Sequence, residues 1–366
     1  MKVMTVVGSS LDRLLSLPIS RALRERHEEV VVFVDGRLDE EISLSPVEAA
    51  LLRAPEYILS GAAGPEGQQM AEVMLRFEEI LHAERPDMLL VRGGTNGALA
   101  GALAASQVGI RVAHLEAGER SFNRREAEEI HRLVIDHVSQ LQFCASRPAI
   151  RHLASEGIVG SAYWVGDVLI DYLEWGRPLA EQHSNIVGRL ALPPGGYALV
   201  SIGRRGNLTD MGRLAKIVDL VNRSPLPAVV LTHPRLAQSL YTLGWTWSPK
   251  VILVEALSYF DLIQLEQQAR LIVTDSGRVQ REAFHAGVPT LTVWEETEWS
   301  DTIDSGWNTI VGMDTERALR AWRESEAPAS RPAFYGDGRS SERLVYLLDG
   351  DPLQAPWESL EAARLP

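Results

Sequence analysis

Two acidic side chains in the first half of the chain stand where proton-transfer chemistry is expected. Glu116 directly follows the apolar run Val112–Leu115, which predicts a buried strand, and doubly wound sheets carry their sites at the carboxyl ends of strands. Glu128 and Arg132 are four residues apart in a helical pattern, so they share a helix face, as either an ordinary surface ion pair or a functional one. Two carboxylates whose pKa values are held apart can act as acid and base.

A second candidate site begins where the predicted strand Leu271–Thr274 runs into Asp275-Ser276-Gly277 and then a helix. The free N–H groups and the positive dipole end of such a helix start suit a diphosphate. Ser276 adds a hydroxyl, and Gly277 lets the backbone approach closely. The Glu282 carboxylate is placed to accept two ribose hydroxyls. The same pattern also fits an ordinary helix N-cap.

Two adjacent arginines follow another predicted strand. Arg204 and Arg205 come directly after Ala198–Ile202, so either can reach a phosphate at the same edge of a sheet. A solvated arginine pair is the alternative interpretation.

The elements that position these residues are strands alternating with helices. Such alternation predicts parallel sheets covered by helices on both faces. Strands are expected at Val3–Val7, Val30–Val34, Met88–Val91, Val112–Leu115, Leu141–Ala145 and Tyr163–Val165, and then at Ala198–Ile202, Ala228–Leu231, Val251–Leu253, Leu271–Thr274 and Thr290–Val293. Helices are expected at Leu11–Glu25, Gly67–Glu84, Asn96–Gln107, Glu126–Val138 and Pro148–Glu156.

The alternation is interrupted once, by a polar stretch from Gly176 to Gly196 that we interpret as a domain junction. The expected fold is therefore α/β, with two Rossmann-like domains facing a central cleft. The first domain is expected over residues 1–175 and the second over 190–350. A C-terminal helix near 351–366 is expected to pack back on the first domain.

Composition narrows the class of protein. The chain has 366 residues, 45% of them hydrophobic and 23% charged, as in a soluble globular protein. A net charge of −13 argues against nucleic acid or an anionic membrane as partner. The single cysteine, Cys144, suits a reducing cytosol, and we expect a cytoplasmic protein. The nine histidines are scattered, so no metal site is expected.

Motifs in both halves resemble those of the UDP-N-acetylglucosamine 2-epimerases, over almost the whole chain. The family's Thr-Asp-Ser-Gly-Gly, followed by an aliphatic residue, Gln, Glu, Glu and Ala, is similar to Thr274–Ala283. In the first half, residues 114–120 are similar to the family's His-x-Glu-Ala-Gly-x-Arg, residues 127–132 to its Pro-Glu-Glu-x-Asn-Arg, and residues 166–171 to its Gly-Asn-x-x-x-Asp. In the second half, residues 201–207 are similar to Thr-Gly-His-Arg-Arg-Glu-Asn and residues 255–259 to Glu-Pro-Leu-x-Tyr. The segment that begins at Thr297 is similar to Thr-Glu-Arg-Pro-Glu.

The resemblance implies an isomerase of the GT-B type that interconverts UDP-GlcNAc and UDP-ManNAc by eliminating UDP and adding it back on the other face. It implies no cofactor, a homodimer, and a role in cell-surface polysaccharide biosynthesis. The partners would be UDP and a UDP-sugar. The implied catalytic residues are Glu116, Glu128 and Arg132; the implied UDP-binding residues are Arg204, Arg205, Tyr259, Ser276, Gly277 and Glu282; the implied sugar-binding residues are His114, Thr297 and Glu298.

Several positions depart from the family pattern. Ser10 and Leu15 stand where the family has an arginine and a lysine, Gly94 replaces an acidic residue, and Gly203 replaces a histidine. In the second half, Arg278 replaces a glycine, Arg281 a glutamate, and Trp294 and Trp299 two arginines.

These substitutions leave two alternatives to an active epimerase: a catalytically degenerate UDP-sugar-binding protein and a GT-B glycosyltransferase, because transferases share the architecture. The Glu116 and Glu128-x-x-x-Arg132 segments favour an epimerase over a transferase.

Overall fold

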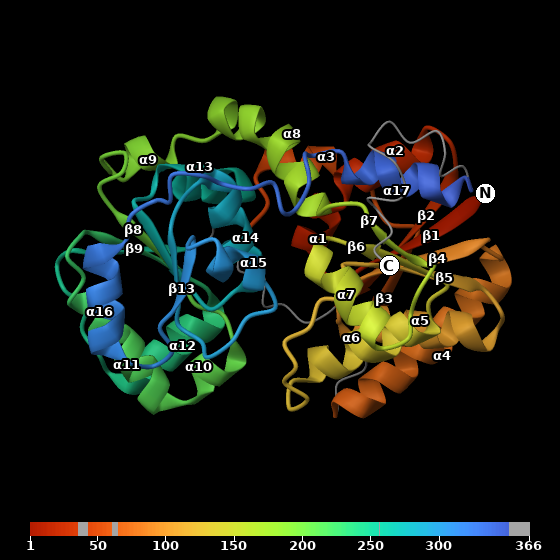
Figure 1. The fold of residues 1–366 in the computed structure, drawn as a ribbon, viewed down its shortest axis with the longest axis horizontal. Helices are drawn as coiled ribbons and strands as arrows, with labels where there is room; N and C mark the ends of the chain where they lie inside the picture. Colours follow the sequence, from red (N-terminus) through yellow and green to blue (C-terminus); the bar gives the residue numbers. More distant parts are fainter. Residues whose placement is uncertain (36–42, 61–64, 256, 351–366) are drawn as a thin grey trace. The chain divides into compact units, whose positions relative to one another are not determined.

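The computed structural model describes residues 1–35, 43–60, 65–255 and 257–350 (Figure 1). The described residues form two compact units. The first unit contains those within 1–35, 50–174 and 333–350, and the second contains those within 43–49 and 175–332. Each unit is built on one parallel sheet, so the predicted α/β class with two Rossmann-like sheets is confirmed.

The sheet of the first unit has seven strands in the order β3-β2-β1-β4-β5-β6-β7. Its strands are β1 (Lys2–Val7), β2 (Glu28–Asp35), β3 (Tyr57–Ser60), β4 (Met88–Arg92), β5 (Arg111–Leu115), β6 (Leu141–Cys144) and β7 (Ala162–Trp164). The helices that precede or follow them are α1 (Ser10–Leu15), α2 (Leu17–Arg24), α3 (Pro46–Leu51), α4 (Glu66–Glu84), α5 (Asn96–Gln107), α6 (Ala127–Val138), α7 (Arg147–Ser155) and α8 (Val168–His183).

Helices cover both faces of this sheet because the strands are apolar on both sides. On one face α5 packs on β1, β4 and β5 with α4 and α6 on either side of it, around Phe77 and Ile135. A Cβ atom at Gly97 would lie 2.9 Å from Val34, so glycine lets α5 sit directly on β2. The strand order reverses between β1 and β4, which places the loops after those strands at a topological switch point, where such sheets bind ligands.

The sheet of the second unit has six strands in the order β10-β9-β8-β11-β12-β13, with its switch point between β8 and β11. Its strands are β8 (Ala198–Ser201), β9 (Ala228–Thr232), β10 (Val251–Glu255), β11 (Leu271–Thr274), β12 (Thr290–Thr292) and β13 (Asn308–Ile310). Its helices are α9 (Ile186–Arg189), α10 (Arg205–Thr209), α11 (Met211–Asn222), α12 (Pro234–Leu243), α13 (Tyr259–Gln268), α14 (Gly277–Ala286), α15 (Ser300–Asp304) and α16 (Thr315–Glu324).

The remaining helix, α17 (Ser340–Leu348), belongs to the first unit, although residues up to 350 were expected in the second. Leu344, Val345 and Leu348 pack in one apolar cluster with core residues of β1 and α2. The backbone N–H groups of Ser340 and Ser341 also donate to the Asp171 carboxylate of α8, at 2.9 and 2.6 Å. The second unit therefore ends at Pro332. The expected terminal helix at 351–366 lies outside the described residues.

Three further elements differ from expectation. The single helix expected over Leu11–Glu25 is two helices, because Pro18 lies in the first turn of α2, where a proline starts a helix well. The polar stretch from Gly176 continues α8 through Pro178 to His183. The short edge strands β3 and β13 carry too few buried residues to be seen in the sequence pattern.

Candidate functional site

Glu116 lies at the carboxyl end of β5, next to the switch point of the first sheet, in a strained backbone. It follows β5 with a φ of 61°, a left-handed conformation that is uncommon for a residue with a side chain. Arg92, the last residue of β4, donates to Glu116 Oε1 from Nε at 2.9 Å and approaches it with Nη2 at 2.8 Å. Strain of this kind persists where the surroundings hold it and is typical of functional sites.

The turn after β4 brings Glu116 and the start of α6 together. A Cβ atom at Gly93 would lie 3.9 Å from Glu116 Oε2, and one at Gly94 would lie 2.6 Å from the backbone oxygen of Glu128. His131 on α6 also hydrogen-bonds to the Gly94 carbonyl oxygen at 2.8 Å. The chain therefore has no room for a side chain at position 94, where the resembling family has an acid.

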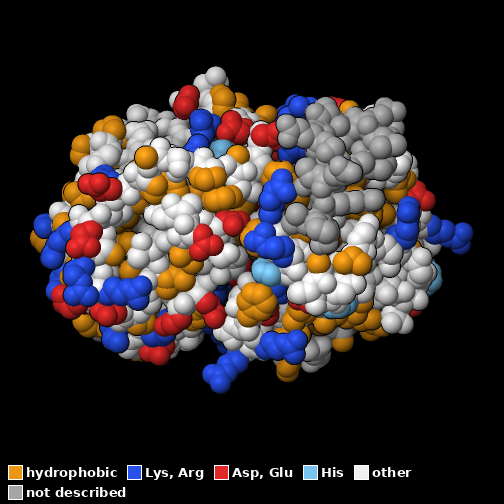
Figure 2. Space-filling view, in the orientation of Figure 1, with side chains coloured by type: hydrophobic (Ala, Val, Ile, Leu, Met, Phe, Trp, Pro, Cys, Tyr) orange, Lys and Arg blue, Asp and Glu red, His pale blue; other side chains and the backbone are white. Residues whose placement is uncertain are grey.

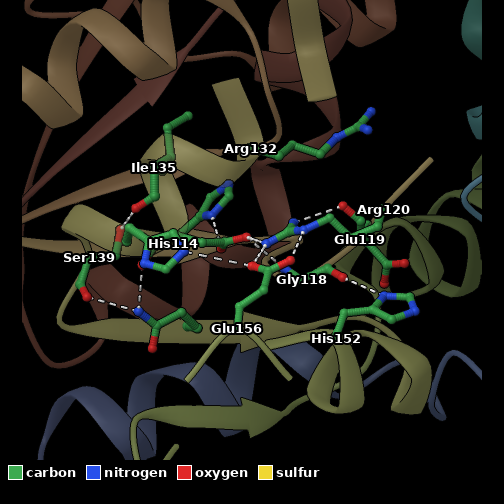
Figure 3. Close-up of polar contacts among 12 residues, drawn as sticks. His114, Gly118, Glu119, Arg120, Arg132, Ile135, Ser139, His152 and Glu156 are labelled. Atoms are coloured by element: carbon green, nitrogen blue, oxygen red, sulfur yellow. Dashed lines mark hydrogen bonds and ion pairs between the residues drawn. The ribbon is translucent and has the colours of Figure 1, made fainter. Parts of the chain in front are cut away.

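The predicted pair of Glu128 and Arg132 is present but loose. Arg132 Nη2 lies 3.4 Å from Glu128 Oε2, and 71% of the Glu128 side chain is exposed. Arg132 Nη1 also lies 3.5 Å from Glu129 Oε2. In Figure 3 the Arg132 side chain extends away from the polar network around Arg120. An exposed carboxylate next to a guanidinium is available to a ligand and adds little to stability.

Glu129 is a residue that the sequence analysis missed. Its buried carboxylate accepts hydrogen bonds from the backbone N–H of Ser121 at 2.9 Å, the Ser121 hydroxyl at 3.1 Å and the Phe122 N–H at 3.1 Å. Phe122 has a φ of 59° and is exposed. Glu129 thus fixes the loop between Glu116 and α6. The Glu-Glu pair in the motif was the available signal.

His114, expected to bind the sugar, is fully buried. Its Nδ1 lies 2.6 Å from Asp136 Oδ1, and its Nε2 lies 3.0 Å from the Gly93 carbonyl oxygen. Both ring nitrogens are thus engaged within the protein. His114 therefore positions the turn after β4 and has no surface for a ligand in this structure.

A second buried network fixes the loop after β5 (Figure 3). Arg120 donates to Glu156 from Nε at 2.9 Å and from Nη2 at 2.7 Å, and its Nη2 also donates to Asp136 Oδ2 at 2.6 Å. Burial alone would raise the pKa of Asp136, but the charges and hydrogen bonds of His114 and Arg120 outweigh burial and hold it below the usual range. The motif's histidine and arginine are thus structural supports for Glu116.

In the second unit, the buried Asp275 organises the loop that carries Arg204. Its Oδ1 accepts from the Gly203 N–H at 2.9 Å, and its Oδ2 accepts from the Arg204 N–H at 3.1 Å and from Asn207 Nδ2 at 2.8 Å. Arg204 Nε donates to the Asp275 carbonyl at 2.8 Å. Arg204 is held in place at the sheet edge, whereas Arg205 is exposed at the start of α10.

The predicted phosphate site at Ser276 and Gly277 lies beside Trp299. A Cβ atom at Gly277 would be 2.5 Å from the indole Nε1 and 3.7 Å from Glu298 Oε2. The guanidinium carbon of Arg281 is 3.8 Å from the centroid of the Trp299 ring. Because Glu298 also pairs with Arg204 at 3.6 Å, the structure brings Arg204, Gly277 and Glu298 together.

Thr297, the third residue expected to bind the sugar, faces α14. Its hydroxyl donates to Gln280 Oε1 at 2.6 Å. Thr297 thus lies beside the predicted phosphate site in the second unit.

A pocket opens at the carboxyl ends of β8 and β9. Its lining is apolar with a few polar groups, as small-molecule sites usually are. The lining residues are Ser201, Leu231, Thr232, His233, Leu257, Leu262 and Arg278.

Glu282 and Tyr259, both expected to contact UDP, do not line this pocket. Both side chains are buried, and Tyr259 donates its hydroxyl to Glu282 Oε1. Arg278 Nη1 lies 2.7 Å from Glu282 Oε1 and 2.6 Å from Oε2. The expected ribose acceptor is therefore occupied by the protein's own arginine.

Leu15 and Gly203, two of the positions that depart from the family pattern, make contacts within the protein. Leu15 is fully buried at the end of α1, so an apolar core contact stands where the resembling family has a lysine. Gly203 contributes only its backbone N–H, to Asp275. Neither residue can donate a side-chain hydrogen bond to a departing diphosphate.

No candidate metal cluster and no helix suited to spanning a membrane is found within residues 1–35, 43–60, 65–255 and 257–350. On the face seen in Figure 2, acidic and basic side chains are interspersed.

Comparison with known proteins places these motifs in context. A family model described as UDP-N-acetylglucosamine 2-epimerase matches residues 21–349. A UDP-N-acetylglucosamine 2-epimerase homolog of Methanococcus maripaludis is 34% identical over 355 residues, which cover 95% of this chain and 99% of the relative. A UDP-2,3-diacetamido-2,3-dideoxy-D-glucuronate 2-epimerase of Pseudomonas aeruginosa is 33% identical over 358 residues, with 95% and 99% covered.

Among solved structures, the UDP-GlcNAc 2-epimerase of Methanocaldococcus jannaschii in complex with UDP-GlcNAc and UDP is similar to this chain. The TM-score is 0.87 at 30% identity, with 96% of this chain and 100% of the other covered.

Proposed function

The chain belongs to the UDP-N-acetylglucosamine 2-epimerase family, and we propose that it is an isomerase that interconverts UDP-GlcNAc and UDP-ManNAc through elimination and re-addition of UDP. The observation that carries this proposal is Glu116, which is held by Arg92 on a strained backbone at the carboxyl end of β5, next to the switch point of the first sheet. Inversion at C2 needs a base for a weakly acidic C–H, and a carboxylate in this position is suited to that task.

Acid–base roles are assigned to the first unit. Glu116 removes the C2 proton, while Glu128, exposed and next to Arg132, delivers or accepts the proton on the other face. Arg92 orients Glu116, and His114 supports the turn on which both depend. His114 is in this assignment a positioning residue and not a sugar ligand.

UDP binding is assigned to the second unit. The pocket lined by Leu231, Leu257 and Leu262 has an apolar wall suited to a nucleoside base. Arg204, fixed by Asp275, supplies the cation that stabilises the departing diphosphate, together with the Gly277 N–H at the start of α14, whereas the Ser276 N–H donates to the Thr274 hydroxyl at 3.0 Å. This charge stands in for the groups that Leu15 and Gly203 cannot provide.

A catalytically silent UDP-sugar-binding protein is the second candidate, favoured by one observation. The contact of Gly94 with the backbone of α6 excludes a third acid from the site. The experiment that separates the two candidates is incubation with UDP-GlcNAc in D₂O, followed by ¹H NMR at C2. Exchange at C2 supports the epimerase, whereas UDP binding without exchange supports the silent protein.

Three wider assignments are also proposed. We propose that the protein is a cytoplasmic homodimer that serves cell-surface polysaccharide biosynthesis. The lone Cys144 is buried, which suits a reducing compartment. Light scattering coupled to size exclusion tests the dimer, since a monomer mass would contradict it.

A further inference from the structure

Arg278 closes off Glu282, the carboxylate that was expected to accept the ribose hydroxyls. The residue is the second of helix α14, and Glu282 lies one turn further on, so the two face each other across i and i+4. Arg278 lines the pocket, while Glu282 lies behind it with 1% of its side chain exposed. A ligand in the pocket thus meets the guanidinium and not the carboxylate.

The hydrogen-bonding capacity of Glu282 is used within the protein. A carboxylate offers about four lone-pair sites. Arg278 Nη1 bridges both oxygens at 2.7 and 2.6 Å, and the Tyr259 hydroxyl takes a further site on Oε1. At most one site is then left, whereas a ribose diol needs two.

Glu266 uses the last of this capacity. Burial raises the pKa of Glu266 well above the usual range, and the adjacent charge of Glu282 raises it further. Glu266 also hydrogen-bonds to Glu282. The guanidinium carbon of Arg278 also lies 5.8 Å from the centroid of the Tyr259 ring, so a second contact holds the arginine in place.

We propose that Arg278 determines the nucleotide specificity of this pocket, so that it binds 2′-deoxyribonucleoside diphosphates as well as ribonucleoside diphosphates. This inference rests on the proposed function, because it takes a nucleoside diphosphate as the ligand of the pocket. A site that hydrogen-bonds a hydroxyl through a charged group rejects the analogue without it, and the carboxylate that would bind the ribose hydroxyls here is engaged by Arg278. The sugars that the protein accepts therefore include those carried on deoxyribonucleotides.

Calorimetric titration of UDP and of dUDP measures the nucleotide preference of the pocket directly, as the ratio of the two Kd values. We expect a ratio within about threefold of one for the parent, because neither ligand finds a free carboxylate on Glu282. Arg278→Met keeps the side-chain volume and frees Glu282, so UDP should then be preferred by about 10-fold or more, the worth of a hydrogen bond to a charged group. Arg278→Gly is a second variant that should give the same result, and it replaces Arg278→Met when the methionine disturbs folding.

Two control variants isolate the cause. Arg281→Met removes the other arginine of α14, which stacks on Trp299, and its ratio should stay near one. Arg278→Met combined with Glu282→Gln should return the ratio toward one. The inference is overturned when the parent prefers UDP over dUDP by 10-fold and Arg278→Met shows the same preference. In that case the ligand displaces Arg278 from Glu282 in the parent. Failure of both nucleotides to bind the parent and every variant overturns the proposed function as well.

Discussion

The Cβ position of Gly94 lies 2.6 Å from the backbone oxygen of Glu128, closer than side-chain atoms approach a carbonyl. The turn after β4 and the start of α6 are thus packed backbone to backbone. This contact leaves no room for an acidic side chain at position 94, so the acids proposed for proton transfer in the first unit are Glu116 and Glu128.

The first prediction concerns that contact. Gly94→Asp, which supplies the acid found in the resembling family, should not raise C2 exchange, because it forces α6 away from the turn. Overpacking of this kind typically costs about 1–3 kcal/mol of unfolding free energy. Urea denaturation and the NMR exchange assay together measure both effects. An active variant of unchanged stability would show that the turn opens readily.

The second prediction concerns Glu129. Glu129→Ala removes the acceptor of three hydrogen bonds from Ser121 and Phe122, and it should lower the unfolding free energy by about 1–3 kcal/mol. Glu128→Ala, one residue earlier and exposed, is the matched control, and its stability should change by less than about 0.5 kcal/mol. Equal losses in the two variants would contradict the assignment of Glu129 as the support of the loop.

The third prediction concerns pH. The pKa of Asp136 is lowered in the folded state, despite its burial, by His114 and Arg120. Its contribution to stability is therefore present above the unfolded-state value of about 3.9 and is lost as pH falls through the lower folded-state pKa. Asp136→Asn should be destabilised by about 3–5 kcal/mol near neutral pH, as for a broken buried pair.

The stability difference between Asp136→Asn and the parent should narrow in acid. Urea denaturation of both proteins at a series of pH values measures it. A difference that stays constant down to about pH 3 would show that Asp136 titrates alike in the folded and unfolded chains.

The fourth prediction separates the two adjacent arginines. Arg204 is fixed by Asp275 and lies 5.2 Å from the centroid of the Trp294 ring, so its guanidinium is oriented before a ligand arrives. Arg204→Met should weaken UDP binding by about 10–100-fold, whereas the exposed Arg205→Met should change it by less than about threefold. Calorimetry on both variants measures this, and a larger loss at Arg205 would reverse the assignment.

Much of the fold follows from the sequence because apolar strands alternate with helices, and the carboxyl ends of such strands lie at one edge of a sheet. Glu116, Arg204 and Ser276 could be placed on that basis. His114 could not, because β5 is buried on both faces and strand alternation does not separate an inward from an outward residue.

In the second unit, too, one contact could be predicted from the sequence and another could not. Arg278 and Glu282 are four residues apart on a helix, so the same i, i+4 spacing that indicated the pair of Glu128 and Arg132 could also have indicated this pair. The packing of Trp299 against Gly277 joins residues far apart in the sequence, and no local pattern predicts it.

The central claim is that Glu116 is the base at C2, and its most direct test is deuterium exchange in Glu116→Gln. This variant keeps the shape of the side chain and the contact with Arg92 but cannot accept a proton. In D₂O with UDP-GlcNAc, the parent should incorporate deuterium at C2, and the variant should lose at least about 100-fold in rate while still binding UDP. Exchange at the parental rate in Glu116→Gln would contradict the account.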